Sequence, residues 1–464
     1  MKIFAHHVII DAAQPAQPAL ITVDGRDITR VDRDDPEPRD ADVVFEDRYA
    51  VVPAFINTHA HLALSALRGL GGLSALRGNV VEDLYFRVEQ ELCAEDVFAF
   101  AQIGAVESLL TGTGIVWDHY YFGDAVARAC EAVGLCAVVA PTLQDLGGPG
   151  IRWLDQQLAE TEAIHHARRL QRAGIVAALG PHATDTVSDE LWRAVHALAQ
   201  AWQAPVHAHL AQSPDELRRS MARHGCPPLT RLRRLGTLDL SVAAVLAHGL
   251  YVRDDELVPL AQESAVLAYT PAAQAQFDFP APAARWAAAG GTVALGTDAG
   301  SCNDSLDIQG DLRLAAVGPA FALTEHPDRI TMAADLSAGA VQRFVARRQT
   351  QFDQKPSLSR LLAMVWDAPG ALHPHLPAGR IAAGCLANLA VYDRHHPAMW
   401  PGLDVKQALA FGRCAGALHA MMTAGRWQGT IGDLQRSVLA RTDVQDAVAE
   451  ANKRLKALLA KIGE

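Results

Sequence analysis

Short apolar stretches alternate with longer segments rich in alanine, leucine, arginine and glutamate along most of the chain after Pro53. A short apolar stretch is typical of a buried strand, and the longer segments are typical of helices. Their alternation predicts βα units that build a parallel sheet. The eight predicted strands cover roughly 50–58, 114–118, 136–141, 174–180, 203–209, 243–248, 265–270 and 291–298.

Eight βα units within about 250 residues match the size of a (β/α)8 TIM barrel. A doubly wound open sheet is the alternative fold for the same alternation. We therefore predict an α/β protein whose catalytic barrel spans residues 50–378.

The two ends of the chain have a different pattern. Residues 1–49 hold short apolar stretches separated by turn-forming and charged residues, and similar stretches return over residues 379–430. This pattern predicts a small β-sandwich domain built from both ends of the chain. Residues 431–464 form a predicted C-terminal helical tail. Within it Val444–Leu459 show amphipathic helical spacing, and we expect this helix to pack on its own chain.

Composition narrows the classes of function. The net charge of −11 and the pI of about 5.9 argue against nucleic acid or an anionic membrane as partner. The sequence shows neither a signal peptide nor an apolar run of membrane-spanning length. Its seven cysteines are scattered without a CxxC motif, which favours free thiols in a reducing cytoplasm. We expect a cytoplasmic protein with a small-molecule substrate. The sequence does not decide whether the protein is a monomer or a homo-oligomer.

Histidines and aspartates recur where the predicted strands end. His59 and His61 end the first strand, and residues two apart in a strand face the same side. Two neutral imidazoles suit zinc and similar divalent metals, although HxH alone is a weak motif. In a barrel the carboxyl ends of all strands meet at one mouth, where active sites lie. The other strand-end residues are Asp118, His119, His182, His207, His209, His248 and Asp298.

Several segments, in order along nearly the whole chain, resemble the amidohydrolase superfamily, in its deaminase and chlorohydrolase branch. This branch includes cytosine and guanine deaminase-like and triazine hydrolase-like enzymes. The matching segments are Pro53–His61, Leu179–Ala183, His207–Gln212, Ala247–Gly249, Leu295–Asp298 and Gly379–Asp393.

The resemblance implies a role for each matching residue. His59, His61, His209 and Asp298 would hold one divalent metal ion, zinc or alternatively iron, with a position left open for water. Asp298 would also act as general base, and His248 would stabilise the oxygen that develops charge. His182 would line the substrate pocket. Since no lysine ends the fourth strand, we expect one metal ion and no carbamylated lysine.

The chain departs from the branch after the fifth strand. Spacing alone cannot choose between His207 and His209 as the metal ligand, since both point the same way. The branch usually carries a glutamate three positions after this ligand, and counting from His209 gives Gln212, whereas counting from His207 gives Leu210. The resemblance therefore favours His209, with Gln212 as a substrate-binding and catalytic residue. Glutamine forms hydrogen bonds but cannot transfer a proton.

Three explanations of Gln212 stay open. Asp298 carries out all proton transfer, Glu216 supplies the missing acid, or the substrate does not need it. We predict a metal-dependent hydrolase acting on a small nitrogen heterocycle, an aminohydrolase (deaminase) in the first instance. A chlorohydrolase or cyclic-amide hydrolase is one alternative, and a metal-binding protein that has lost turnover is another. The glycine-rich stretch Gly69–Leu73 is a predicted loop and a candidate lid.

Overall fold

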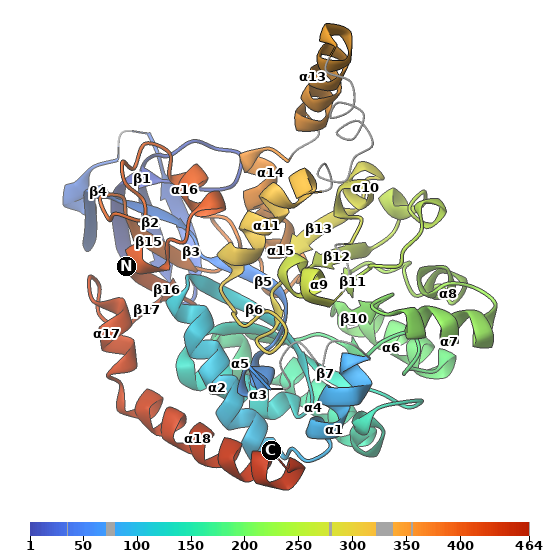
Figure 1. The fold of residues 1–464 in the computed structure, drawn as a ribbon. Coiled ribbons are helices and arrows are strands. Elements are labelled where there is room, and N and C mark those ends of the chain that lie inside the picture. Colours follow the sequence, from blue (N-terminus) through green and yellow to red (C-terminus); the bar gives the residue numbers. More distant parts are fainter. Residues whose placement is uncertain (35, 71–78, 278–280, 322–336, 354–355, 464) are drawn as a thin grey trace.

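The computed structural model describes residues 1–34, 36–70, 79–277, 281–321, 337–353 and 356–463. Figure 1 shows a central barrel surrounded by helices, with a separate sheet at its side that contains both early and late strands of the chain. The predicted lid stretch lies partly outside the described residues, since these end at Leu70 and resume at Asn79.

The barrel strands pair in parallel, and their ring closes. One junction is made where the amide of His207 donates to the carbonyl of Leu179 at 2.9 Å. The other is made where Asp298 pairs with Ala60. This closure confirms the TIM barrel and excludes the open sheet. The strands are β5 (Phe55–His61), β6 (Thr113–Tyr120), β7 (Cys136–Leu143), β8 (Ile175–Ala177) with β9 (Gly180–Pro181), β10 (Val206–Leu210), β11 (Ala244–His248), β12 (Ala265–Tyr269), and β13 (Thr292–Leu295) with β14 (Asp298–Ala299).

The strand alternation decides which side chains enter the barrel. Ile115 and Trp117 of β6 belong to the apolar cluster inside the barrel, so His119 on the same face also points inward. Val206 and Ala208 of β10 pack in the outer cluster, which turns His207 and His209 inward. Polar side chains thus lie above an apolar barrel floor.

A seven-stranded sheet joins the two chain ends in the order β17-β16-β15-β4-β1-β2-β3, as the sandwich prediction required. Its strand β4 runs from Val43 to Pro53, so the predicted first strand 50–58 is divided between this sheet and the barrel. The remaining strands are β1 (Lys2–Val8), β2 (Gln17–Asp24), β3 (Asp27–Asp32), β15 (Leu389–Asp393), β16 (Leu418–Thr423) and β17 (Arg426–Gln428).

Helices cover the barrel and form the tail (Figure 1). In the tail, α18 packs on α2, and Arg454 Nη1 donates to Asp96 Oδ1 at 3.0 Å. No described helix is long and apolar enough to cross a membrane. The α-helices are α1 (Phe86–Glu89), α2 (Ala94–Leu110), α3 (Gly123–Val133), α4 (Leu154–His166), α5 (Arg168–Arg172), α6 (Asp189–Trp202), α7 (Pro214–His224), α8 (Pro228–Arg234), α9 (Pro271–Phe277), α10 (Ala283–Ala288), α11 (Ile308–Phe321), α13 (Ala338–Asp353), α14 (Leu358–Ala363), α15 (Asp367–Gly370), α16 (Val405–Phe411), α17 (Leu434–Leu439) and α18 (Thr442–Ile462). Short helical turns are η1 (Pro38–Asp40), η2 (Leu62–Leu67), η4 (Val81–Tyr85), η5 (Pro149–Trp153), η6 (Asp254–Glu256), η7 (Leu260–Gln262) and η8 (Ala415–Ala417).

Candidate metal centre and active-site cavity

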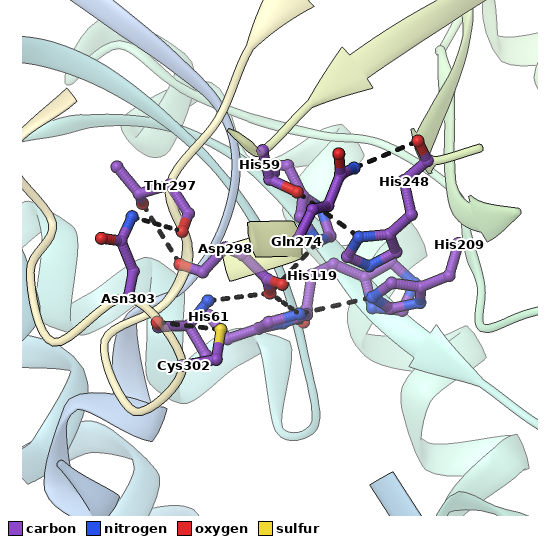
Figure 2. Close-up of polar contacts among 12 residues, drawn as sticks. His59, His61, His119, His209, His248, Gln274, Thr297, Asp298, Cys302 and Asn303 are labelled. Atoms are coloured by element: carbon purple, nitrogen blue, oxygen red, sulfur yellow. Dashed lines mark hydrogen bonds and ion pairs between the residues drawn. The ribbon is translucent and has the colours of Figure 1, made fainter. Parts of the chain in front are cut away.

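The structure brings the four predicted metal ligands together at the barrel mouth (Figure 2). Nε2 of His61 lies 3.3 Å from Nε2 of His209, and Asp298 Oδ1 lies 3.4 Å from Nε2 of His61 and 3.6 Å from Nε2 of His59. Ligands about 2.0–2.1 Å from a tetrahedral ion are separated by about 3.4 Å. The spacing of these four side chains therefore fits one zinc-sized ion.

Hydrogen bonds at the opposite nitrogen orient each imidazole. Nδ1 of His61 donates to the carbonyl of His119, and Nδ1 of His209 donates to the carbonyl of His182 at 2.7 Å. Nδ1 of His59 lies 2.8 Å from Nε2 of His207. With each Nδ1 engaged in this way, each Nε2 is available as a metal ligand. His59 Nε2 is buried without a hydrogen-bond partner in the described chain, which suits a group that binds an ion.

The protonation states also suit a cation. Burial is the largest influence on the histidines, and it lowers the pKa of His59 to about 3 and the pKa values of His61 and His209 below their ordinary range. Burial acts to raise the pKa of Asp298, but the imidazole of His59, whose Nε2 lies 3.6 Å from Oδ1, and the charges of His248 and His61 outweigh it and lower this pKa. At neutral pH the cluster thus offers neutral imidazoles and one carboxylate, the donor set that zinc prefers.

The seam between the first and last barrel strands holds the ligands in position. Asn57 Nδ2 donates to Thr297 Oγ1 at 2.8 Å, and its Oδ1 accepts from the Thr297 amide at 3.1 Å. Gly296 lies so close to the backbone of His59 that a Cβ added at Gly296 would be 2.7 Å from the carbonyl oxygen of His59. Asp298 has a left-handed backbone with φ of 64°, which is strained for a residue with a side chain.

His248 reaches the cavity through an irregular backbone. Leu246 faces the outer core, so regular strand geometry would also direct His248 outward. Instead its φ is 77°, Gly249 continues the left-handed turn at 66°, and the ring lines the cavity. Gln274 Nε2 donates to the His248 carbonyl at 3.2 Å and supports this turn (Figure 2). A ring nitrogen of His248 can also share an ion with His59 and His209.

The cavity above this cluster has aromatic and apolar walls with few charges. The predicted residues His182 and Gln212 line it. His182 is fixed by a 2.9 Å contact between its Nδ1 and Thr186 Oγ1. Glu89 contributes a buried carboxyl, and burial raises the pKa of this group to about 8. The apolar and aromatic wall includes Leu64, Val81, Tyr85, Phe86, Tyr120, Tyr121 and Leu250.

The two open questions about the fifth strand now have a structural context. His209 points Nε2 at the ligand cluster, whereas His207 Nε2 contacts His59 Nδ1. His207 therefore lies behind the cluster. The carboxylate of Glu216 accepts a hydrogen bond from the backbone amide of Gln212 at 2.8 Å and another from the Thr184 hydroxyl. Both of its oxygens are therefore engaged. Glu216 does not belong to the cavity wall, where Gln212 stands in its place.

Sequence reasoning did not assign roles to several cavity residues. Glu89 and Tyr85 lie on the segment from η4 to α1, whose path no periodicity predicts. His119 and Tyr120 end β6; the strand-end rule selected His119 without giving it a role, and it did not select Tyr120. Cys302 follows Asp298 in a loop that we would otherwise treat as an ordinary connection.

A closed parallel barrel with a buried histidine and aspartate cluster at its carboxyl end defines the metal-dependent hydrolase barrels. The family model described as "Amidohydrolase family" matches residues 50–428, which include all four clustered side chains. The chain therefore belongs to the amidohydrolase family, and the resemblance found in its sequence is confirmed.

Known proteins support this assignment. The 5-methylthioadenosine/S-adenosylhomocysteine deaminase of Haloarcula marismortui is 30% identical over 400 residues, which cover 84% of this chain and 84% of that protein. A zinc-bound adenosine deaminase of Xanthomonas campestris has a TM-score of 0.77 at 22% identity, covering 98% of each chain. A zinc complex of the atrazine chlorohydrolase of Arthrobacter aurescens has a TM-score of 0.78 at 21% identity, covering 98% of this chain and all of that one (100%). At these identities the two structures show a shared fold.

Proposed function

We propose that the protein is an aminohydrolase that replaces the exocyclic amine of an adenine-type nucleoside by oxygen, using one metal ion. The main support is the convergence of His59, His61, His209 and Asp298 at the base of a cavity with aromatic walls. The deaminase of 5-methylthioadenosine and S-adenosylhomocysteine, with 30% identity over most of both chains, supports the choice of substrate class.

An ion held by these residues would lower the pKa of water towards about 7 and supply hydroxide at neutral pH. Asp298 Oδ1 faces the same point as the imidazole nitrogens and remains ionised, so it can accept the proton of the attacking water. His248 lies on the adjoining wall, where its ring can contact the oxygen that becomes bonded to carbon.

The leaving amine must gain a proton before it departs as ammonia. Gln212 can hold the ring by hydrogen bonds but cannot supply this proton. We infer that Asp298 delivers to the amine the proton that it takes from water. Water then contributes its oxygen to the ring carbon, one of its protons goes to the amine, and the other stays on the oxygenated heterocycle. The carbon–nitrogen bond breaks, and the amine leaves as ammonia with its own two hydrogens and that one proton.

Zinc is the ion we propose, because the donor set and the distances fit it. We propose that residues 50–378 form the catalytic domain and that 1–49 with 379–430 form the supporting one. A cytoplasmic location is also proposed, since all seven cysteines have free thiols.

Ammonia release from adenosine, 5'-methylthioadenosine and S-adenosylhomocysteine by the zinc-loaded protein tests the proposal. We expect turnover of at least one of them, and a loss of at least about 1,000-fold in Asp298→Asn, which lacks the base. Gln200→Glu, an exposed change on α6, is the matched control and should keep wild-type rates. Absence of ammonia with every purine and pyrimidine would refute the aminohydrolase.

A chlorohydrolase is the second candidate, because a chloride ion leaves without the proton that Gln212 cannot give. The shared fold with the atrazine chlorohydrolase makes atrazine a suitable probe. Chloride release without ammonia release from any amine would favour this candidate. If neither product forms in the wild type but Gln212→Glu releases ammonia, the protein binds metal and has lost turnover.

A further inference from the structure

His119 offers an unused nitrogen to the active-site cavity. It lies on the inward face of β6, its side chain is buried at 1% exposure, and it forms part of the cavity wall. Its Nε2 is buried without a hydrogen-bond partner among the described residues. Leaving such a group unpaired is costly, so an unpaired ring nitrogen on a residue that lines the cavity indicates a ligand atom that pairs with it.

The His119 ring has a fixed position. Its Nδ1 lies 3.1 Å from Thr142 Oγ1, and its carbonyl accepts the hydrogen bond that orients His61. The ring of His209 packs against it at 4.9 Å between centroids. A rotation of the imidazole would break the contact with Thr142, so Nε2 keeps its direction before a ligand arrives.

His119 also lies close to the reaction centre. One of its ring nitrogens is within 4.8 Å of ring nitrogens of both His61 and His209. Since Nδ1 is engaged by Thr142, Nε2 is the nitrogen available for this approach. A heterocycle whose reacting carbon lies over the cluster can therefore place a neighbouring atom beside His119.

We propose that His119 Nε2 forms a hydrogen bond with a ring nitrogen of the bound heterocycle and thereby selects which heterocycles are accepted. Gln212 and His119 are then two polar contacts to the ring, while the aromatic residues pack on its remaining surface. This inference depends on the proposed function for its substrate class. A neutral imidazole can pair with either a ring nitrogen or a ring N–H, since its Nε2 donates in one tautomer and accepts in the other.

The test compares purine ribosides that each lack one ring nitrogen, at N1, N3 or N7. Their inhibition constants, or dissociation constants from calorimetry, are measured with the zinc-loaded wild type, His119→Phe and His119→Asn. In the wild type, loss of the nitrogen that faces His119 should weaken binding by about 10- to 100-fold, the usual cost of an unpaired buried polar group. His119→Phe should bind the complete and the deaza riboside equally well, and His119→Asn should keep part of the difference.

Thr142→Val tests the orientation of the ring separately. This variant keeps the imidazole but removes the contact at Nδ1, and we expect it to reduce the discrimination between the two ribosides by several-fold. If Thr142 had a purely structural role, Thr142→Val would weaken the binding of all ribosides alike.

Metal content separates this role from metal binding. Both His119 variants should keep the wild-type ratio of zinc to protein, and loss of zinc in both would show a metal ligand and overturn the proposal. Unchanged discrimination in His119→Phe with zinc retained would overturn it as well. If the wild type binds the ribosides with the expected pattern but releases no ammonia, the proposed function fails and this inference stands. If the wild type binds none of them, both fail.

Discussion

Glu89 gives the pH dependence of stability a measurable origin. The residue is 5% exposed in the cavity wall, and burial raises the pKa of its carboxyl from the ordinary 4.5 to about 8. Between these values the folded protein keeps Glu89 protonated while the unfolded chain ionises it. Stability therefore falls as pH rises through this window, and above pH 8 the folded state carries the full penalty of a buried charge.

The replacement Glu89→Gln removes this penalty. Each pH unit within the window corresponds to about 1.4 kcal/mol, so the stability of the variant relative to wild type should rise by about 4 kcal/mol between pH 5 and pH 9. At about 2.1 cal/mol/K for each residue, unfolding of the whole chain has an entropy near 1 kcal/mol/K. The difference in Tm between Glu89→Gln and wild type should thus increase by about 4 °C.

Differential scanning calorimetry at fixed zinc concentration measures this change at both pH values. Glu91→Gln is the matched control, because Glu91 is exposed on the same segment and its replacement should leave Tm unchanged at pH 5 and pH 9. Other titrating groups are common to all three proteins and cancel in the comparison. A Tm difference that stays constant with pH, or that decreases, would show that the pKa of Glu89 is not raised in the folded protein.

Three further predictions concern the ligand cluster. Asn57→Ala removes both hydrogen bonds to Thr297 and should lower the free energy of unfolding, measured by urea denaturation, by about 2–4 kcal/mol. Thr29→Val, at an exposed position on the edge strand β3, is the control and should have little effect. The methyl group of Gly296→Ala must displace His59, so the zinc content of this variant, determined by plasma mass spectrometry, should fall well below that of wild type. A variant that still binds one zinc ion per chain would contradict the close contact. Removal of metal with a chelator should abolish turnover and added zinc should restore it, and activity that survives complete removal of metal would exclude the proposed chemistry.

The barrel and the position of its chemistry were accessible from the sequence for a physical reason. Each strand is a short apolar stretch, and the polar residue that follows it must lie at the shared carboxyl end. This rule places His59, His61, His209 and Asp298 together without knowledge of any distance. In the structure Nε2 of His61 lies 3.3 Å from Nε2 of His209, and Asp298 Oδ1 lies 3.4 Å from His61 and 3.6 Å from His59.

Other parts of the site depend on features that a linear pattern does not contain. His248 enters the cavity because its backbone is left-handed, which reverses the side expected from strand alternation. Glu89 reaches the cavity from a segment without regular spacing, and Pro53 ends one sheet immediately before Phe55 begins another. These features follow from tertiary packing, which overrides local preference.

The joint between β14 and β5 gives the metal ion a second role. His59 and His61 stand on one side of this joint and Asp298 on the other, with few backbone pairs between them. An ion bound by all three would cross-link the first strand of the barrel, β5, to its last, β14. The zinc concentration would then set the free energy of unfolding of the protein as well as its catalytic rate, because a ligand that binds only the folded state stabilises it.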